Sequence, residues 1–409
     1  MTSLPLTSII LFDDQSWQDL LPLTFTRPLS ELRVGILTIK EKWEHWLHGE
    51  VSYITQDYLS EKFKLIIKHE NYLINSSYLP TEALVLQVKS LSAGQAIYDH
   101  NTLVAAKLSA ETIAKVVVDK NNISTSTNFK KIDGENLTYE RITKPYHIFS
   151  KNGQELTKDF NLITKGRQSQ AISNTNQVFG KHPIFLEKGV YMECCIINTH
   201  EGPVYLGKDV QVMEGSMIRG GFAACEGSIV KMGAKIYGPT TIGPHCRLGG
   251  EVNNSVLLAN SNKGHDGFLG NSVLGEWCNL GADTNNSNLK NNYLPVKIWS
   301  YSKEGFEDTG LQFCGLIMGD HSKAGINTMF NTGTVVGVAA NIFGDGFPRN
   351  FIPSFSWGGA SGIIKHQLNK ALETAAIVLK RRNQELSDED ANILTHLFQA
   401  ENQNRFPNP

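Results

Sequence analysis

The chain has 409 residues, of which 41% are hydrophobic and 19% charged, and its formal net charge is −2 at pH 7. This length is enough for roughly two or three domains with cores of their own. A charge so close to neutral gives no basic surface of the kind that binds nucleic acid, so small molecules are the expected partners. The six cysteines show no C-x-x-C spacing, which favours reduced thiols over a disulfide scaffold or structural zinc.

The first residues carry no targeting signal. They read MTSLPLTSIILF, without a basic region, and their apolar run is too short for a signal peptide or a membrane span. We therefore expect a cytoplasmic protein with no membrane partner.

Residues 1–165 have the pattern of an α/β domain. Short apolar runs such as 9–12 and 83–88 alternate with amphipathic stretches such as 36–47. That alternation is typical of strands and helices packed in layers. We predict an α/β domain over 1–165.

One segment of this domain carries a signature. The run Leu20-Leu21-Pro22-Leu23-Thr24 is followed by Arg27-Pro28, Leu32 and Gly35. It resembles the end of the sugar-nucleotidyltransferase signature, in which a glycine-rich loop with an arginine leads into L-x-P-L-T, a nearby proline and a lysine. The resemblance implies a nucleotidyltransferase-like domain.

The part of that signature that binds phosphate is altered. In the family, backbone N–H groups of the glycine-rich loop wrap the nucleotide phosphates. Here residues 12–19 read FDDQSWQD, with Asp19 at the arginine position and Leu29 at the lysine position. Carboxylates would repel a triphosphate unless a divalent metal bridged them. The candidate Mg²⁺ ligands are Asp13 and Asp14, and the candidate replacement charges for the nucleotide are Arg27, Arg33 and Lys42. A domain in which these residues are only caps and surface charges is the alternative.

A six-residue period follows from about residue 184. Apolar residues stand six apart in four sets: Ile184, Val190 and Ile196; Ile236, Ile242 and Leu248; Phe268, Leu274 and Leu280; and Met318, Ala324, Phe330, Val336 and Ile342. A period of six fits neither a helix nor a simple strand, and it is the mark of a hexapeptide β-helix. We predict a left-handed parallel β-helix over 166–362, with 220–226 and 294–310 as loops that leave the coil.

The pattern becomes helical at the end of the chain. Residues 363–382 carry apolar residues at helical spacing, and Ser387 with Asp390 is typical of a capping box that opens a last helix. We expect the helices of 363–409 to cover the open end of the solenoid or to pack on a neighbouring subunit.

The stretch 263–293 carries the chemistry. It reads KGHDGFLGNSVLGEWCNLGADTNNSNLKNNY. It resembles the acetyltransferase half of the bifunctional UDP-N-acetylglucosamine pyrophosphorylase/glucosamine-1-phosphate acetyltransferase. The whole chain resembles the GlmU-like sugar nucleotidyltransferases, some of which are described as glucose-1-phosphate thymidylyltransferase-like. The resemblance implies acyl transfer from acyl-CoA, such as acetyl-CoA, to an amino-sugar phosphate or a nucleotide-sugar.

The resemblance also assigns residues. It implies that His265 is the general base, that Asn279 contacts the sugar nucleotide and Ala282 the acetyl-CoA, and that Asn288 holds the place of a conserved asparagine. Phe268 replaces a tyrosine that contacts substrate, and Leu289 replaces another tyrosine. The family's lysine and arginine upstream of the histidine fall at Asn253 and near Tyr237, which leaves the acceptor sugar open.

The residue types suit this chemistry without the resemblance. A neutral imidazole can accept a proton from an attacking amine near working pH. Lys263 and Lys290 offer charge for a phosphate, and asparagines such as Asn279 and Asn288 offer amides for sugar hydroxyls. Two carboxylates are candidates to orient the imidazole of His265. They are Glu251 and Asp283, the second because a coil of 18 residues would place it directly over His265. Asparagines in such coils also form purely structural ladders.

Three other functions stay open. The protein could be a nucleotidyltransferase only, or it could bind sugar nucleotides without catalysis. A zinc enzyme like the γ-class carbonic anhydrases is a further alternative, although the solenoid histidines lack the H-x4-H pair of such sites. Relatives of the β-helix assemble as trimers with active sites between subunits, which implies a homo-oligomer here.

Overall fold

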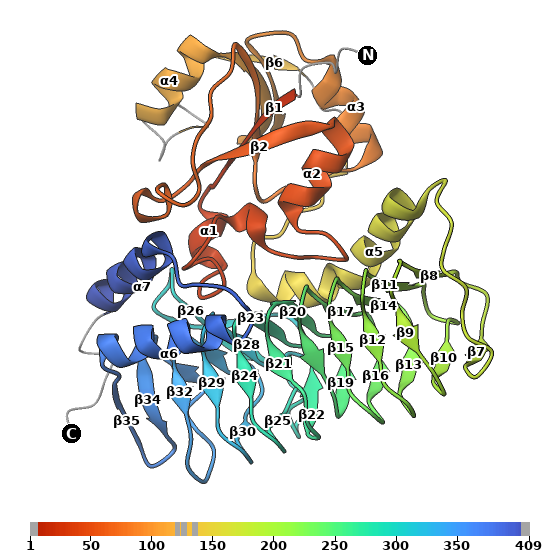
Figure 1. Cartoon of the computed structure of the whole chain (residues 1–409). Coiled ribbons are helices and arrows are strands. Elements are labelled where there is room, and N and C mark those ends of the chain that lie inside the picture. The colour runs from red at the N-terminus through yellow and green to blue at the C-terminus, as the bar shows by residue number, and fades with distance from the viewer. Residues whose placement is uncertain (1–6, 119–122, 124–128, 133–137, 402–409) are drawn as a thin grey trace. The chain divides into compact units, whose positions relative to one another are not determined.

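The computed structural model describes residues 7–118, 123, 129–132 and 138–401, and these form two compact units (Figure 1). Unit 1 comprises Met1–Leu20, Thr26–Leu32 and Leu37–Thr143, and unit 2 comprises Leu21–Phe25, Arg33–Ile36 and Lys144–Pro409. The first six residues, on which the expected lack of a signal partly rests, lie outside the described residues. Among the described helices, none is both long and apolar enough to cross a membrane.

Unit 1 is built on one mixed sheet of six strands in the order β2-β1-β3-β5-β4-β6. β1 is parallel to β2 and β3, whereas β5 is antiparallel to β3 and β4. The strands are β1 (Thr7–Phe12), β2 (Gly49–Ile54), β3 (Glu70–Asn75), β4 (Gln95–Asp99), β5 (Thr102–Ser109) and β6 (Lys130–Ile132). The connecting helices are α1 (Ser16–Asp19), η1 (Leu29–Glu31), α2 (Ile39–Leu47), η2 (Asp57–Leu59), α3 (Glu82–Ser90) and α4 (Ala110–Val118).

The central strand β1 explains the apolar run at residues 9–12. Five of its six residues are buried, as expected for a strand covered on both faces. α2 begins at a capping box, in which the Thr38 hydroxyl accepts from the Glu41 N–H and the Glu41 carboxylate accepts from the Thr38 N–H. The predicted α/β domain is therefore present.

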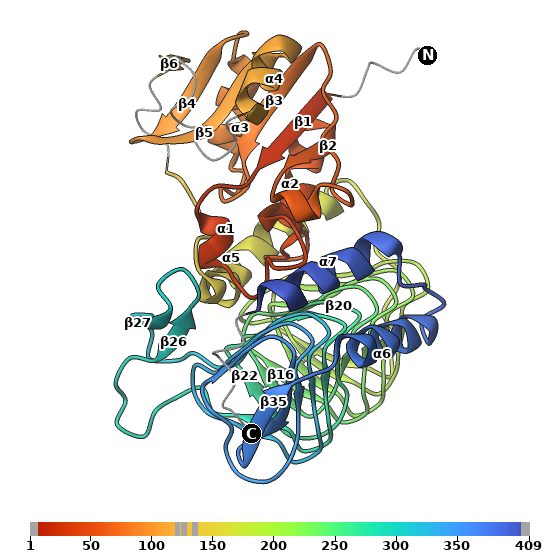
Figure 2. The ribbon, with the colours of Figure 1, turned by 90° about the vertical axis from the view of Figure 1, so that its left-hand side faces the viewer.

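Unit 2 is a solenoid whose successive coils contribute short, mostly parallel strands to three sheets, and it is seen nearly end-on in Figure 2. The first sheet contains β7 (Gln177–Phe179), β10 (Ile196–Asn198), β13 (Met217–Arg219), β16 (Lys235–Tyr237), β19 (Glu251–Asn253) and β22 (Phe268–Gly270). The second contains β8 (Ile184–Leu186), β11 (Val204–Leu206), β14 (Phe222–Ala224), β17 (Thr240–Ile242), β20 (Val256–Ala259), β23 (Val273–Glu276), β28 (Ile317–Met318), β31 (Val335–Val336) and β33 (Phe351–Ile352). The third contains β9 (Tyr191–Met192), β12 (Gln211–Val212), β15 (Ile229–Val230), β18 (Arg247–Leu248), β21 (Asn262–Lys263), β24 (Asn279–Leu280), β29 (Lys323–Ala324), β32 (Asn341–Ile342), β34 (Ser356–Gly359) and β35 (Gly362–Lys365). The predicted fold class, an α/β domain followed by a left-handed parallel β-helix and C-terminal helices, is confirmed.

Two further strand pairs lie outside these three sheets. β25 (Asn285–Asn286) pairs with β30 (Met329–Phe330), and β26 (Lys297–Ser300) forms a hairpin with β27 (Gly305–Asp308). The hairpin confirms that residues 294–310 leave the coil. The other expected loop, 220–226, is wrong, because Phe222–Ala224 is the strand β14 inside the second sheet.

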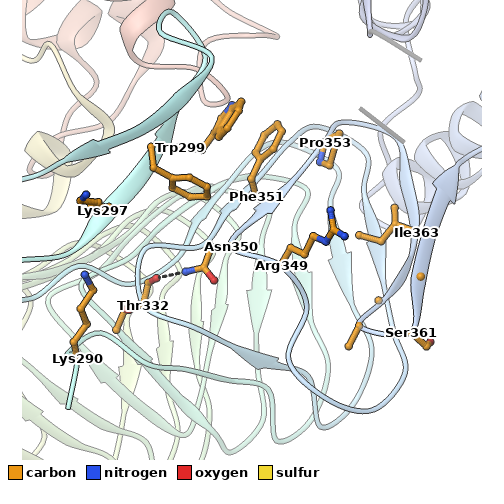
Figure 3. Close-up of a pocket in the computed structure, with 14 residues that line it drawn as sticks. Lys290, Lys297, Trp299, Thr332, Arg349, Asn350, Phe351, Pro353, Ser361 and Ile363 are labelled. Carbon is orange, nitrogen blue, oxygen red and sulfur yellow. Dashed lines mark hydrogen bonds between the residues drawn. The ribbon is translucent and has the colours of Figure 1, made fainter. Parts of the chain in front are cut away.

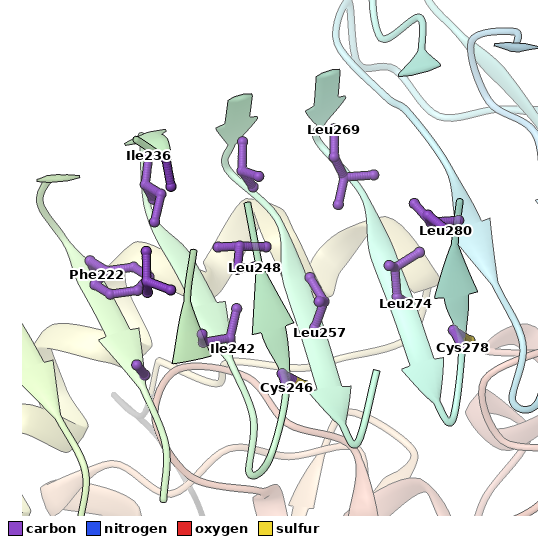
Figure 4. Close-up of a cluster of buried hydrophobic side chains, with 14 of the residues drawn as sticks. Phe222, Ile236, Ile242, Cys246, Leu248, Leu257, Leu269, Leu274, Cys278 and Leu280 are labelled. Atoms are coloured by element: carbon purple, nitrogen blue, oxygen red, sulfur yellow. The ribbon is translucent and has the colours of Figure 1, made fainter. Parts of the chain in front are cut away.

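The interior of the solenoid is a continuous stack of apolar side chains. Ile236, Ile242 and Leu248 point inward, as the hexad pattern predicts, and Figure 4 shows them stacked against the same positions of the next coils. The predicted six-residue pattern is wrong at two positions. Ile196 and Phe268 face outward, and the next residues, Ile197 and Leu269, point into the core. Each inward Leu or Ile contributes about 1.5–3 kcal/mol of burial.

The C-terminal helices lie along the side of the solenoid. α6 (Leu368–Lys380) runs beside the third sheet, and α7 (Asp388–Ala400) begins at Ser387, whose hydroxyl accepts from the Asp390 N–H (Figure 1). Residues 363–365, expected to be helical, instead belong to β35. After α6, Arg382 donates to the Asn262 side chain (3.0 Å) and to the His245 carbonyl (2.8 Å). These bonds fix the helix on the third sheet, so covering the open end is not its role.

The long helix α5 (Pro145–Thr164) packs on the second sheet of the solenoid and holds residues 33–36 in the same unit. The Gly35 N–H donates to the Asn152 side chain (2.9 Å), and the Ile36 N–H donates to Asp159 (2.9 Å). Gly35 has φ +84°, and an added Cβ would lie 2.5 Å from an Asp159 oxygen and 2.7 Å from the Glu155 carbonyl carbon. Only glycine fits this position without strain.

We expect Gly35→Ala to destabilise unit 2 by about 2–4 kcal/mol, because it adds a clash with α5 to the cost of positive φ. Gly166→Ala is the matched control: Gly166 has φ +73° and nothing within 4 Å of an added Cβ. Its expected cost is only about 1 kcal/mol. Denaturant unfolding of both variants measures the difference, and equal losses of stability would contradict the role given to the α5 contact.

Candidate functional site

The first candidate site lies where β1, β2 and β3 end in unit 1. The carboxyl ends of parallel neighbours meet at one edge of a sheet, and ligands of α/β folds bind there. Asp13 follows β1 and accepts hydrogen bonds from the Leu29 N–H (3.0 Å) and from the hydroxyl of Thr55 after β2 (2.6 Å). Burial raises the pKa of Asp13 to about 7, against these hydrogen bonds, which lower it.

Asp14 lies at the centre of a polar cluster at this edge. One of its oxygens accepts from the Ser16 N–H (2.8 Å), and the other accepts from the Asn75 amide (2.9 Å) and from the Arg141 guanidinium (3.0 Å). Arg141 also donates to the Ser77 hydroxyl (3.1 Å) and lies 4.5 Å from the centre of the Tyr78 ring. The Asn75 amide and the Ser77 hydroxyl are fully buried, whereas the Arg141 side chain is 28% exposed and its guanidinium can bind a phosphate.

This arrangement does not favour the expected Mg²⁺ site. Every carboxylate oxygen of Asp13 and Asp14 already accepts a hydrogen bond, and Arg141 occupies the side of Asp14 that a cation would take. Within the described ranges, no group of three His, Cys, Asp or Glu residues is placed to hold a metal ion.

The basic residues proposed for the nucleotide are largely buried. Arg27 and Lys42 belong to unit 1 and are 7% and 1% exposed. Arg33 belongs to unit 2, where its guanidinium donates to the Ile36 carbonyl and contacts the Cys225 sulfur. The cation that the structure does place at the strand ends is Arg141, which the sequence analysis missed. It follows no recognisable motif, and only the pairing of Arg141 with Tyr78 brings it to this edge.

The second candidate site is the coil corner at His265, between β21 and β22 of unit 2. The imidazole is exposed, and no hydrogen-bond partner for it is found among the described residues. An imidazole in this state is accessible to a ligand. Among the residues that the structure describes, no carboxylate forms an ion pair or hydrogen bond with this imidazole.

Lys263 shapes this corner from inside the coil. Its side chain is 1% exposed, and its ammonium donates to the carbonyls of Gly249 (3.2 Å), His265 and Asp266 (3.2 Å). Burial lowers the pKa of Lys263 to about 8, although Asp266 and Asp283 oppose the shift. The ammonium thus ties the corner to the preceding coil and does not present its charge to solvent.

The expected stacking of Asp283 over His265 is off by one residue. The coil has 17 residues here, as the pairing of Asn262 with Asn279 shows, and the Asp283 N–H donates to the Asp266 carbonyl (3.1 Å). Asp283 therefore stacks on Asp266 in the preceding coil, and Ala282 is the residue that stacks on His265. The second candidate carboxylate, Glu251, accepts from the Tyr237 hydroxyl (2.6 Å) on the first sheet.

The remaining predicted contacts lie on three different faces. Phe268 is on the outer face of the first sheet, and its N–H donates to the Asn285 side chain (2.7 Å). Asn288 donates to the Asn271 side chain at the next corner (2.8 Å). Asn279 accepts from Asn262 (3.4 Å) in a ladder on the third sheet, beside the bonds from Arg382. Lys290 lines a pocket beside the hairpin β26–β27.

That pocket is a feature that the sequence did not reveal. It has a volume of about 820 Å³ and lies entirely within unit 2 (Figure 3). Its lining residues come from the hairpin, from β33 and from the turn between β34 and β35. These segments are far apart in the chain, so no motif joins them.

Comparison with known proteins gives one informative match. Residues 9–168 match the family model described as sugar nucleotidyl transferase, a range that covers the strands of unit 1 and α5. This match confirms the prediction of a transferase. No curated protein matches the chain.

Solved structures are similar only at a low level. The polySia-specific acetyltransferase NeuO is 12% identical, with 51% of this chain and 100% of that chain covered and a TM-score of 0.30. The Arabidopsis UDP-N-acetylglucosamine acyltransferase is 14% identical, with 58% and 92% covered and a TM-score of 0.20. Scores this low say nothing about the activity of this chain.

The lowered pKa of Lys263 predicts a pH dependence of stability. Between about pH 8 and pH 10.5 the folded state has lost a proton that the unfolded state still binds. The contribution of Lys263 to the free energy of unfolding therefore rises with pH across this window. We expect Lys263→Met to lower the free energy of unfolding by about 1–3 kcal/mol at pH 7, because three backbone carbonyls lose their hydrogen-bond donor. The difference in the free energy of unfolding between wild type and Lys263→Met should increase from pH 8 to pH 10. A constant gap in urea titrations would contradict the buried ammonium.

Proposed function

We propose that the protein is an enzyme of sugar-nucleotide metabolism whose unit 1 transfers a nucleotidyl group between a nucleoside triphosphate and a sugar 1-phosphate. The observation that carries this proposal is the match of residues 9–168 to the sugar nucleotidyl transferase model. The cluster of Asp14, Asn75 and Arg141 at the strand ends supports it, because this is the edge where α/β sheets bind nucleotides.

The proposed reaction breaks one bond to phosphorus and forms another. An oxygen of the sugar 1-phosphate attacks the α-phosphorus, the bond to the β-phosphate breaks, and pyrophosphate leaves. Arg141 would stabilise the negative charge on the phosphoryl oxygens, while its contacts with Ser77 and Tyr78 hold it in place. Asn75 and Ser77 are fully buried and hold Asp14 and Arg141 in place through their hydrogen bonds. The proposed reaction includes no step for the expected Mg²⁺, because the carboxylates of Asp13 and Asp14 already accept hydrogen bonds within the protein.

Arg141→Met should reduce nucleotidyl transfer by roughly 100-fold, because it removes the guanidinium from the phosphate position. The measurement is pyrophosphate release with each of the common nucleoside triphosphates and a panel of sugar 1-phosphates. Lys115→Met is the matched control, since Lys115 lies in an exposed ion pair with Glu111 (2.8 Å) elsewhere in unit 1.

Two results would count against this assignment. One is full activity in a folded Arg141→Met protein. The other is no pyrophosphate release from wild type with any substrate pair, combined with nucleotide-dependent shifts of the melting temperature, which would favour a binding protein without turnover.

A second candidate function is acyl transfer on the β-helix, and the imidazole of His265 favours it, because it is exposed and has no hydrogen-bond partner among the described residues. His265 would take the proton from an amine or hydroxyl of the sugar as it attacks the thioester of acyl-CoA. The carbon–sulfur bond then breaks, and CoA leaves as a thiol. The resemblance of residues 263–293 to the acetyltransferase supports this role, with Ala282 against the acyl-CoA and Asn288 near the sugar. Relatives with this corner complete the site between subunits, so we propose a homotrimer in the cytoplasm.

His265→Ala should lower acyl transfer by roughly 100- to 10,000-fold, the range for loss of a general base. The assay is thiol release from acetyl-CoA with amino-sugar 1-phosphates and nucleotide-amino-sugars as acceptors. His200→Ala is the control, because His200 is another exposed histidine at the end of a first-sheet strand. Near-normal thiol release in the His265→Ala protein would remove the assignment.

A further inference from the structure

The pocket of about 820 Å³ in unit 2 is large enough for a nucleotide, since small-molecule sites span about 300–1,000 Å³. Figure 3 shows Lys290 and Lys297 on one side of the pocket and Arg349 on the other. Asn350 and Thr332 lie between them. The Asn350 amide donates to the Thr332 carbonyl (2.8 Å), which fixes this part of the wall.

The charge of the pocket is uniformly positive. Three of its lining residues are cationic, and none of the lining residues is Asp or Glu. Lys290 donates to the Pro295 carbonyl (2.7 Å), whereas Lys297 and Arg349 are exposed and make no ion pair with any described residue. In a chain of net charge −2, three cations without a carboxylate indicate an anionic ligand.

The aromatic wall indicates that the ligand also carries a planar ring. Trp299 stacks on Phe351 with ring centres 4.2 Å apart, and Phe306 meets Trp299 edge-on at 5.4 Å. Phe306 is 50% exposed, so this wall is open to a further ring. The indole N–H of Trp299 is buried and has no acceptor among the described residues.

We propose that this pocket binds the nucleoside diphosphate portion of a substrate. Lys297, Arg349 and Lys290 hold the two phosphates, and the base packs against Phe306 and Trp299.

Two substrates contain this portion, a nucleotide-sugar and acyl-CoA. For acyl-CoA the inference rests on the proposed acyl transfer, whereas for a nucleotide-sugar it stands without either proposed activity. UDP and UDP-N-acetylglucosamine test the first source, and ADP and acetyl-CoA test the second.

The test is calorimetric titration of the full-length chain carrying Arg141→Met, which removes the cation from the proposed nucleotide site of unit 1. Either UDP or ADP should bind, and Arg349→Met or Lys297→Met should weaken binding by roughly 10-fold or more through loss of a charge-assisted phosphate contact. Trp299→Phe should weaken it by roughly 3- to 10-fold, because the smaller ring leaves less aromatic surface for the base. Lys303→Met is the matched control, because Lys303 lies between the two strands of the hairpin, pairs with Glu307 (2.7 Å) and does not line the pocket. The Lys303→Met variant should bind UDP or ADP with unchanged affinity.

Pyrophosphate alone should bind at least roughly 10-fold more weakly than the nucleoside diphosphate, because it lacks the base. Equal binding of pyrophosphate would overturn the nucleotide assignment. So would the absence of UDP and ADP binding, or affinities that Arg349→Met and Trp299→Phe leave unchanged while the variants keep the wild-type melting temperature. Absence of pyrophosphate release from the wild-type protein with every substrate pair, combined with intact pocket binding, would refute the unit 1 reaction and leave this inference standing.

Discussion

The hydrogen bonds between successive coils determine where every functional side chain of unit 2 lies. Each strand pairs in parallel with the strand one coil before it, so the number of residues in a coil decides which side chains stack. At His265 the coil has 17 residues, one fewer than three full hexads. The missing residue is taken from the corner, because the apolar stack inside tolerates no gap. This one-residue step pairs Asp283 with Asp266 and not with His265.

The contacts of α5 explain why a short segment from the N-terminal part of the chain belongs to unit 2. Residues 33–36 leave unit 1 because α5 binds their backbone through Asn152 and Asp159. Asn152 also donates to the Pro239 carbonyl (2.9 Å) and accepts from Thr241 (3.1 Å), which ties the same helix to the solenoid. Gly35, noted first as part of a nucleotidyltransferase signature, is required here by the close approach of α5. The matched family range, 9–168, ends just beyond that helix.

The sequence predicted those features that repeat and missed those that depend on a single contact. The hexads at Ile236, Ile242 and Leu248 repeat a pattern over many coils, and the structure follows it. The register at Asp283 depends on the length of one corner, which no periodicity reveals. Arg141 and Arg349 reach their sites only through folding, and their neighbours in sequence give no sign of a ligand. The altered loop at Asp13 and Asp14 was noticed, but its partners Thr55, Asn75 and Arg141 come from other strands.

The basic residues of unit 2 have two different roles: some stabilise the fold, and others are available to bind a ligand. Lys263 stands in the motif where a phosphate contact was expected, yet its buried ammonium satisfies three backbone carbonyls. A buried ammonium with such partners is costly to withdraw, because the carbonyls would lose their donor. Lys297 and Arg349 are exposed, lack carboxylate partners among the described residues, and face aromatic rings across one pocket. Charges that no carboxylate or backbone carbonyl engages are the most available to a ligand. In unit 2 the basic pocket beside the hairpin has such charges, whereas Lys263 serves to hold the backbone that presents His265.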